Sequence, residues 1–186
     1  MSTHNQDTFN GPSFSLSNRI ARVIWNLVYV LLFKYSPKPL HAWRSFLLRL
    51  FGAKVGKNVH VYPKVSIWAP WNLILKDGCG IANGAILYAQ DKITIGVKTV
   101  VSQGAHICAG THDYNTEGFI LITKPITIGD HAWIATEAFI HPGVTIGNGA
   151  VIGARAVVGK SMPEWMICSG HPCKPIKARE IIFKNN

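Results

Sequence analysis

The side chains of this chain that are best suited to chemistry are its histidines. The chain has eight of them, and His112 stands in the sequence Thr111-His112-Asp113. A neutral imidazole, with a pKa near about 6.5, can accept a proton from a hydroxyl at neutral pH or bind zinc. Asp113 or a backbone carbonyl in the following segment could fix the tautomer of the ring. A lone histidine is more often structural or simply exposed, so the elements that position it must decide its role.

Zinc binding and thiol chemistry are the other chemistries to weigh. The histidines available as zinc ligands in the middle of the chain are His106, His112, His131 and His141. The four cysteines are Cys79, Cys108, Cys168 and Cys173, and they show no CxxC spacing. Two of them fall where a small apolar side chain is wanted, so we expect reduced thiols and no metal.

A repeat with a period of six residues dominates the middle of the chain. Its fifteen branched aliphatic members are Val55, Val61, Ile67, Leu75, Ile81, Leu87, Ile95, Val101, Ile107, Ile128, Ile134, Ile140, Ile146, Ile152 and Val158. The residue four positions after each member is Val, Ala, Cys or Thr in twelve of the fifteen cases. This period is neither that of a helix nor that of a sustained strand. One large and one small inward residue in every six predicts short strands separated by regular turns.

The phase of the repeat predicts a three-sided solenoid. Three hexapeptides make one coil of 18 residues, and an extra dipeptide separates the first coils. Five coils are expected, at residues 55–72, 75–92, 95–112, 128–145 and 146–163. Glycine follows the aliphatic residue at six positions, where a corner tolerates no side chain. Between the third and fourth coils the dipeptide is replaced by residues 113–127, directly after His112, and long insertions in a solenoid usually carry function.

The segment before the repeat predicts two helices. The first covers residues 16–35 with Ser17 as N-cap, and the second lies near Leu40 to Phe51. The apolar run from Val23 to Phe33 is shorter than the ~20 residues that span a bilayer, so we expect no membrane crossing. Packing of both helices on the domain or on a neighbouring subunit is the first interpretation. A peripheral membrane contact through residues 16–51 is the alternative, favoured by the Trp and Arg content.

Charge and composition exclude several classes of protein. The formal net charge is +10, and residues 1–52 hold six Lys or Arg and one acid. A basic surface suits anionic lipid, a phosphorylated small molecule or nucleic acid, but no nucleic-acid motif and no regular row of basic residues is present. We therefore expect no nucleic-acid partner. The polar start MSTHNQDTFNGPS lacks the features of a secretory signal, which predicts a cytoplasmic protein, with the inner face of the membrane as the site of any peripheral contact.

Three parts of the chain follow from these patterns. Residues 1–52 form a polar N-terminus and helical appendage, residues 53–163 the solenoid, and residues 164–186 a C-terminal cap. The cap is expected to contain a short strand, a turn through Gly170, His171 and Pro172, and a helix rich in Lys and Arg. Solenoid ends need such covers because their last coils have no neighbour.

Several stretches of the sequence resemble one family. They are LLRLFGAKVG at 47–56, PWNL at 70–73, VSQGAHICAGTHDY at 101–114, PITIGDHAWIATEAFIHPGVTIG at 125–147, VIGARAVVG at 151–159 and GHPCKPIKAR at 170–179. Together they are similar to the hexapeptide-repeat acyltransferases, and most of all to the colanic-acid biosynthesis O-acetyltransferase type. Maltose, galactoside, serine and nodulation-factor acetyltransferases are more distant relatives. The resemblance implies a left-handed parallel β-helix, a homotrimer and acetyl-CoA as the acetyl donor.

The resemblance also assigns roles to residues. It implies that His112 is the general base, with Asp113 as a candidate for orienting its ring. On the CoA side it implies contacts from Trp133, Ala135, Ala154, Lys160, Lys174 and Arg179. Ala135 replaces the commoner glycine of this motif, and its backbone N–H is the expected oxyanion donor. The family's GNPA-like turn is replaced here by Gly170-His171-Pro172-Cys173, which puts side-chain assignments near it in doubt.

For the acceptor, family analogues indicate polar residues of the second coil. The candidates are Asn83, Tyr88 and Asp91, of which Asp91 could equally form a salt bridge or cap a corner. The expected reaction is direct transfer of acetyl from acetyl-CoA to a sugar hydroxyl, in exopolysaccharide or lipopolysaccharide biosynthesis. The alternatives are a γ-class carbonic anhydrase with a zinc site of histidines, a non-enzymatic scaffold at a membrane, and a transferase with serine or another amino acceptor.

Overall fold

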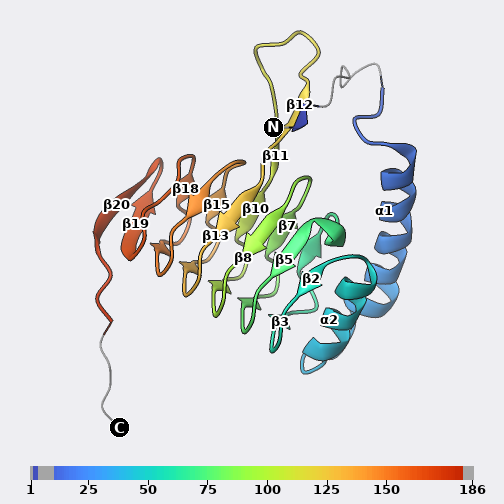
Figure 1. Ribbon diagram of the computed structural model, residues 1–186, viewed down its shortest axis with the longest axis horizontal. Coiled ribbons are helices and arrows are strands. Elements are labelled where there is room, and N and C mark those ends of the chain that lie inside the picture. Colours follow the sequence, from blue (N-terminus) through green and yellow to red (C-terminus); the bar gives the residue numbers. More distant parts are fainter. Residues whose placement is uncertain (1, 4–10, 182–186) are drawn as a thin grey trace.

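The protein folds as a three-sided solenoid with helices over one end and a β-hairpin over the other (Figure 1). The computed structural model describes residues 2–3 and 11–181. Each coil contributes one short strand to each of three parallel sheets. The first sheet contains β2 (Lys54–Val55), β5 (Leu73–Leu75), β8 (Ile93–Ile95), β13 (Ile126–Ile128) and β16 (Thr145–Ile146). A two-residue strand has almost no stability of its own, so the sheets depend on stacking between coils.

The second and third sheets follow the same order along the solenoid. The second contains β3 (His60–Val61), β6 (Gly80–Ile81), β9 (Val100–Val101), β14 (Trp133–Ile134) and β17 (Val151–Ile152), followed by β19 (Met166–Gly170) and β20 (Cys173–Ala178). The third contains β4 (Ser66–Ile67), β7 (Ile86–Tyr88), β10 (His106–Cys108), β15 (Phe139–Ile140) and β18 (Val157–Val158). A 3₁₀ turn, η2 (Pro70–Asn72), leads from the first coil into the second.

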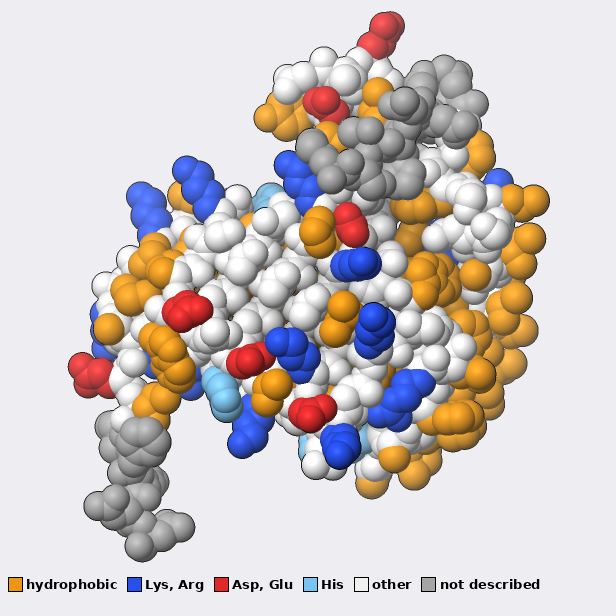
Figure 2. Space-filling view, in the orientation of Figure 1, with side chains coloured by type: hydrophobic (Ala, Val, Ile, Leu, Met, Phe, Trp, Pro, Cys, Tyr) orange, Lys and Arg blue, Asp and Glu red, His pale blue; other side chains and the backbone are white. Residues whose placement is uncertain are grey.

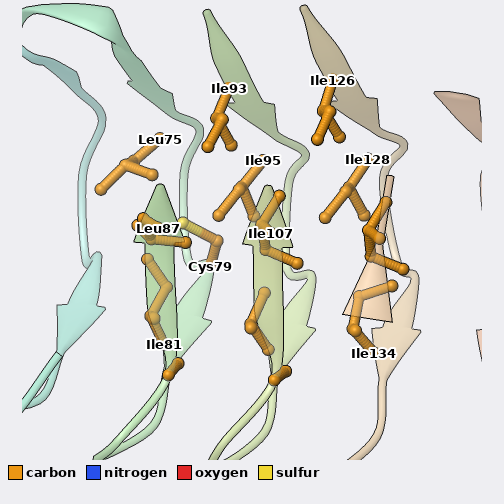
Figure 3. Packing of buried hydrophobic residues seen from close by; sticks show 14 of the residues in the cluster. Leu75, Cys79, Ile81, Leu87, Ile93, Ile95, Ile107, Ile126, Ile128 and Ile134 are labelled. Carbon is orange, nitrogen blue, oxygen red and sulfur yellow. The ribbon is translucent and has the colours of Figure 1, made fainter. Parts of the chain in front are cut away.

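The aliphatic repeat fills the interior, as predicted. Fourteen of its fifteen members are buried, and Val55 is half-buried because it lies in the first coil. Members of successive coils stack in register: Ile95 pairs with Leu75 below it and with Ile128 above it. Figure 3 shows these stacked side chains pointing into the solenoid. At the corners, a Cβ on Gly96 would lie 2.3 Å from the carbonyl carbon of Gly129, so this corner accepts only glycine.

The coil count differs slightly from the prediction. Five complete coils are followed by part of a sixth, because Met162 bridges to Ile146 and β19 pairs in parallel with β17. Pro163 therefore does not end the solenoid. Met162 and Cys168 are buried as inward residues of this partial coil. The repeat was lost from the sequence at this point because the aliphatic positions are taken by methionine and cysteine.

The two predicted helices are present at the N-terminal end. They are α1 (Leu16–Val28), which continues as the π-helical turn η1 (Tyr29–Phe33), and α2 (His41–Leu50). The N-cap of α1 is Ser15, whose hydroxyl accepts a hydrogen bond from the Asn18 N–H, so the prediction of Ser17 was wrong by two residues. The polar N-terminal segment lies largely outside the described residues, at 1 and 4–10.

Buried polar contacts fasten both helices to the first coil. The Trp25 indole is fully buried and donates to the Ile67 carbonyl over 2.8 Å. The guanidinium of Arg44, also fully buried, donates to the Val61 carbonyl over 2.6 Å and to the Pro37 carbonyl over 2.9 Å. A buried arginine is stable only when its donors are used in this way. The helices therefore cover the first coil in a fixed position.

The predicted C-terminal helix is wrong where the structure describes it. Residues 173–178 form β20, which pairs antiparallel with β19 through the predicted turn, and residues 182–186 lie outside the described part. β20 is an edge strand, and its Lys174, Pro175 and Lys177 are residue types that prevent further strand pairing at an exposed edge. The basic composition that suggested a helix is thus explained by the edge position.

The stacked core predicts a large cost for a single truncation. Ile107→Ala removes a fully buried side chain between Leu87 and Ile140, and we expect a loss of about 2–5 kcal/mol in the free energy of unfolding, measured by urea denaturation. Val100→Ala, at a side chain that is 47% exposed on an outer face, is the control and should change it by less than about 0.5 kcal/mol. Equal losses in the two variants would contradict this account of the core.

Candidate active site

His112 lies where the regular winding of the chain is interrupted. It ends β11 (Gly110–His112), which pairs antiparallel with β12 (Leu121–Thr123) and rises from the solenoid as a hairpin (Figure 1). The short strand β1 (Ser2–Thr3) pairs with the other edge of β12. The second half of the predicted insertion, residues 113–127, therefore contains β12 and the start of β13 (Ile126–Ile128), and the loop between the two hairpin strands covers residues 113–120. The coil boundary predicted at residue 112 is two residues late, because the chain leaves the solenoid at Gly110 and His112 lies on the hairpin strand beyond that corner.

One hydrogen bond determines which nitrogen of His112 is free. Its Nδ1 lies 2.6 Å from the Phe119 carbonyl oxygen. A carbonyl can only accept, so Nδ1 carries the proton and Nε2 keeps its lone pair. The side chain is exposed, so Nε2 is accessible to a ligand. This is the arrangement that a general base requires.

The orienting group is therefore the Phe119 carbonyl and not Asp113. The Asp113 carboxylate accepts a hydrogen bond from the Asn115 N–H over 2.9 Å, and its carbonyl accepts one from the Thr116 hydroxyl. Asp113 thus shapes the turn that returns the chain to β12. Phe119 itself has a φ of 43°, in the left-handed region that a bulky residue rarely occupies. Such strain is typical of loops whose backbone path is functional.

His112 lines a pocket of about 260 Å³ together with residues that are distant in the sequence. The pocket is lined by Pro12, Ser13, Phe14, Arg19, Arg22, Trp68, Tyr88, Gln90, His112 and Leu121. Sequence reasoning found His112 and Tyr88 but missed the others. No spacing could have found Arg19 and Arg22, because they reach the pocket only through the way α1 packs beside the solenoid.

Gln90, one of the residues that line this pocket, has a buried acceptor without a partner among the described residues. The Gln90 amide nitrogen donates to the Tyr88 hydroxyl over 3.0 Å, while its Oε1 is buried without a hydrogen bond among the described residues. Burial raises the pKa of Tyr88, so it stays a neutral phenol at physiological pH. A Cβ on Gly110 would collide with the Gln90 side chain, so the glycine of β11 leaves room for that amide.

Two guanidinium groups give the pocket a positive wall. Arg22 stacks over the Trp68 ring at 4.4 Å, and its Nε is buried without a hydrogen bond to any residue that the structure describes. Neither Arg22 nor Arg19 forms an ion pair with any residue in the described ranges. No carboxylate lines the pocket.

The other two predicted acceptor residues lie elsewhere. The Asn83 side chain accepts a hydrogen bond from the Lys64 N–H over 3.1 Å at a corner of the solenoid. The Asp91 carboxylate accepts one from the Lys92 N–H over 2.7 Å, which matches the corner-capping alternative. Neither residue lines the His112 pocket, so within one chain the structure brings only Tyr88 together with His112.

The predicted oxyanion donor is also wrong in its detail. The Ala135 N–H donates to the Ile152 carbonyl over 2.9 Å as part of the second sheet and is therefore occupied. The next amides at this corner, those of Thr136 and Ala154, form no hydrogen bond within the described chain. They belong to adjacent coils, ~4.8 Å apart. Free amides repeated along one corner suit the amide-containing pantetheine arm of CoA, so the Ala154 prediction fits the geometry and Thr136 joins it.

The remaining CoA candidates do not converge on one point. Trp133 is exposed on the second sheet, and its indole donates to the Ser102 hydroxyl over 2.9 Å. Arg179 donates to the carbonyls of His131 and Gly149, both over 2.8 Å, so it anchors the C-terminal cap. Lys160 and Lys174 are exposed on other elements. Of the three basic candidates, Lys160 and Lys174 are the ones whose side chains form no hydrogen bond or ion pair with the described residues.

In the described part of the chain, the cysteines and histidines form no second candidate for a nucleophilic or metal-binding site. Burial raises the pKa of Cys79 to about 12 and that of Cys173 to about 11, and burial also raises the pKa of Cys108 and Cys168. Thiolate nucleophiles are therefore scarce at neutral pH. Among residues 2–3 and 11–181, no group of three or more His, Cys, Asp or Glu side chains is placed to bind a metal ion.

Comparisons with known proteins agree with this geometry. The family model for the bacterial transferase hexapeptide (six repeats) matches residues 125–160. The chain is 45% identical to a protein of Escherichia coli K12 named putative colanic acid biosynthesis acetyltransferase WcaF, over 166 residues, which is 89% of this chain and 91% of that protein. The chain therefore belongs to the hexapeptide-repeat acyltransferases, and its fold is their left-handed parallel β-helix.

Solved structures place it more closely among the acetyltransferases of this family. A maltose O-acetyltransferase from Clostridium difficile 630 superposes with a TM-score of 0.82 at 27% identity, covering 90% of each chain. A galactoside acetyltransferase in complex with coenzyme A gives a TM-score of 0.68 at 25% identity, covering 94% of this chain and 90% of that one. The protein is an acyltransferase that uses acetyl-CoA, and its relative WcaF is named for colanic acid biosynthesis.

His106, which borders Tyr88, predicts a pH-dependent stability. Its ring packs between Tyr88 and Phe139, and burial lowers its pKa. The folded protein therefore binds this proton less readily than the unfolded chain, whose histidine pKa is about 6.5. The contribution of neutral His106 to stability is complete above that pH and decreases as the pH falls below it.

We expect the urea midpoint to fall between about pH 6.5 and pH 5, and to fall less in His106→Phe, which keeps the aromatic contacts but does not titrate. The comparison of the two proteins isolates His106 from other titrating groups. An identical pH dependence in both would show that His106 does not carry this effect.

Proposed function

We propose that this protein transfers an acetyl group from acetyl-CoA to a hydroxyl of a saccharide, with His112 as the general base. The observation that carries the proposal is the hydrogen bond between His112 Nδ1 and the Phe119 carbonyl, which places the proton of the neutral imidazole on Nδ1 and leaves Nε2 as the acceptor of an exposed side chain. A sugar hydroxyl is a poor nucleophile at neutral pH unless a base accepts its proton. Such assistance is typically worth about 10² to 10⁴ in rate.

The reaction is a direct transfer in a ternary complex. His112 Nε2 accepts the proton of the acceptor hydroxyl as its oxygen attacks the thioester carbonyl, and the imidazolium then returns the proton to the departing CoA thiolate. The bond that forms is the acetyl ester, and the bond that breaks is the thioester. The raised pKa values of the buried cysteines support a mechanism without an acyl-cysteine.

The acceptor is proposed to be a building block of an exopolysaccharide or lipopolysaccharide. The support is the name of the colanic acid biosynthesis enzyme and the names of the maltose and galactoside enzymes that this chain resembles. The pocket offers a saccharide the aromatic side chains of Trp68 and Tyr88 next to His112. Its two guanidinium groups favour an acceptor with a phosphate or carboxylate.

We further propose that the protein works as a homotrimer in the cytoplasm, with a peripheral contact at the inner face of the membrane through residues 16–51. A trimer would bring the free corner amides and the exposed Trp133 of one chain next to a neighbour. It would also allow the hairpin that carries His112 to reach toward the adjacent solenoid. These assignments extend the family resemblance to this chain.

His112→Ala is the decisive test of the catalytic proposal. We expect kcat to fall by about 10² to 10⁴, with CoA release followed by a thiol assay and acetylated products identified by mass spectrometry across a panel of cell-envelope saccharides. His141→Ala, on the same face but outside the pocket, is the matched control and should keep near-normal activity. Unchanged turnover in His112→Ala would overturn the role of this histidine.

The oligomeric state is tested by light scattering of the purified protein. A trimer of 20.4 kDa chains has a mass of about 61 kDa. A mass of a single chain at working concentrations would contradict the proposed assembly, because sites shared between neighbouring solenoids could not form. Closed cyclic assemblies of this kind are common among homo-oligomers.

A further inference from the structure

The N-terminal helices expose an unusually apolar surface. Of the twenty large hydrophobic side chains exposed in the described ranges, thirteen lie between residues 16 and 50. Figure 2 shows them as one orange region that covers α1 and α2 at the end of the solenoid. Soluble monomers rarely expose continuous apolar patches of this kind unless the patch meets a partner. We name residues 16–50 on this side the apolar face.

The apolar face follows the geometry of α1. Leu16, Ile20, Val23, Leu27 and Leu31 recur at helical spacing, and each is more than half exposed. The opposite side of the helix holds Trp25 and Phe33, which are fully buried against the solenoid. The helix is therefore apolar on both sides, but only one side is used by the fold. The other side requires a further apolar environment.

The second helix extends the same surface. The Trp43 indole donates to the Leu32 carbonyl over 3.0 Å, and its ring stacks on Phe46 at 5.8 Å. The hydrogen bond connects α2 to η1. Leu50, which is 68% exposed, continues the face toward the start of the solenoid. Indole and phenyl rings of this kind are typical of the boundary between water and lipid.

Charge determines which partner suits this face. Residues 8–76 contain ten Lys or Arg and no Asp or Glu. Arg19, Lys38 and Arg49 are exposed beside the apolar side chains. Two copies of the chain meeting through this face would bring like charges together without any carboxylate nearby. The apolar side chains and the basic residues of this face together suit a partner that is both apolar and anionic. The surface of a bilayer that contains anionic lipids has both properties.

The orientation follows from the way α1 is fastened. Leu16–Phe33 is 18 residues long with a mean hydropathy of 1.2, so by length and composition alone it could cross a membrane. The buried Trp25 and its hydrogen bond to the Ile67 carbonyl keep the helix against the first coil. Crossing would carry that polar coil into hydrocarbon or break the contact. The geometry favours a helix that lies parallel to the surface.

We infer that the apolar face docks in the plane of an anionic lipid bilayer, with Val23, Leu27 and their neighbours in the acyl boundary and the basic residues at the phosphates. The same helix carries Arg19 and Arg22, which line the His112 pocket. Docking therefore places the pocket beside the membrane surface. This step rests on the proposed function: if the protein acetylates a saccharide, the position of the pocket at the membrane implies that the saccharide is linked to a lipid.

The test measures vesicle binding by the full chain without any acetyl transfer, so its failure is separate from failure of the proposed function. We expect co-flotation with phosphatidylglycerol/phosphatidylcholine vesicles at low salt, and much less with phosphatidylcholine alone or at high salt. The variant V23E/L27E should lower the bound fraction about tenfold or more. Leu50→Glu tests α2 independently and should also lower it.

Ile176→Glu is the matched control, because Ile176 is 63% exposed and Leu27 is 61% exposed, yet Ile176 lies on β20 at the other end of the solenoid. It should bind vesicles as the unchanged chain does, and circular dichroism should show all four proteins folded. Absence of vesicle binding, equal binding by V23E/L27E, or a lower oligomer mass of V23E/L27E without lipid would each overturn the inference. Retention after an alkaline carbonate wash would replace in-plane docking by a spanning helix.

Discussion

The structure depends on hydrogen bonding between successive coils. A strand of two or three residues cannot persist by itself, and each one here is stabilised by the strand one coil below and one coil above. The inward aliphatic residues repeat because each coil must offer its neighbours the same stacking surface. Every departure from the repeat must therefore occur at a corner or at an end. The β11–β12 hairpin departs at a corner, and the helices and the β19–β20 hairpin lie at the ends.

The register of the sheets is the same before and after the β11–β12 hairpin, where the chain leaves the solenoid. Ile95 and Ile128 are 33 residues apart in sequence, yet they are direct partners in adjacent coils. The extra residues leave the solenoid as β11 and β12 and return without shifting the ladder. His112 consequently stands on a rigid base while the loop beyond it has its own hydrogen bonds. A solenoid can in this way present a reactive side chain without loss of core packing.

Much of the fold could be predicted from the sequence, because the period of six and its phase directly reflect coil geometry. The position of His112 followed from the same phase to within two residues. The site predictions that were missed or wrong depend on contacts between segments remote in sequence. Arg22 and Gln90 line the pocket, the Ala135 N–H is already hydrogen-bonded, and Arg179 anchors the C-terminal cap. The C-terminal helix was mistaken because an edge strand and an exposed helix share a basic composition. The partial sixth coil was missed because Met162 and Cys168 replace the usual aliphatic residues.

The orientation of His112 by a main-chain carbonyl has a consequence for how such enzymes can diverge. Every amino acid placed at position 119 presents the same carbonyl, so no side-chain substitution there removes the acceptor from Nδ1. What must be preserved is the path of the backbone, including the left-handed conformation at this residue. The side chains of the loop can therefore change while the orientation of the His112 ring is preserved.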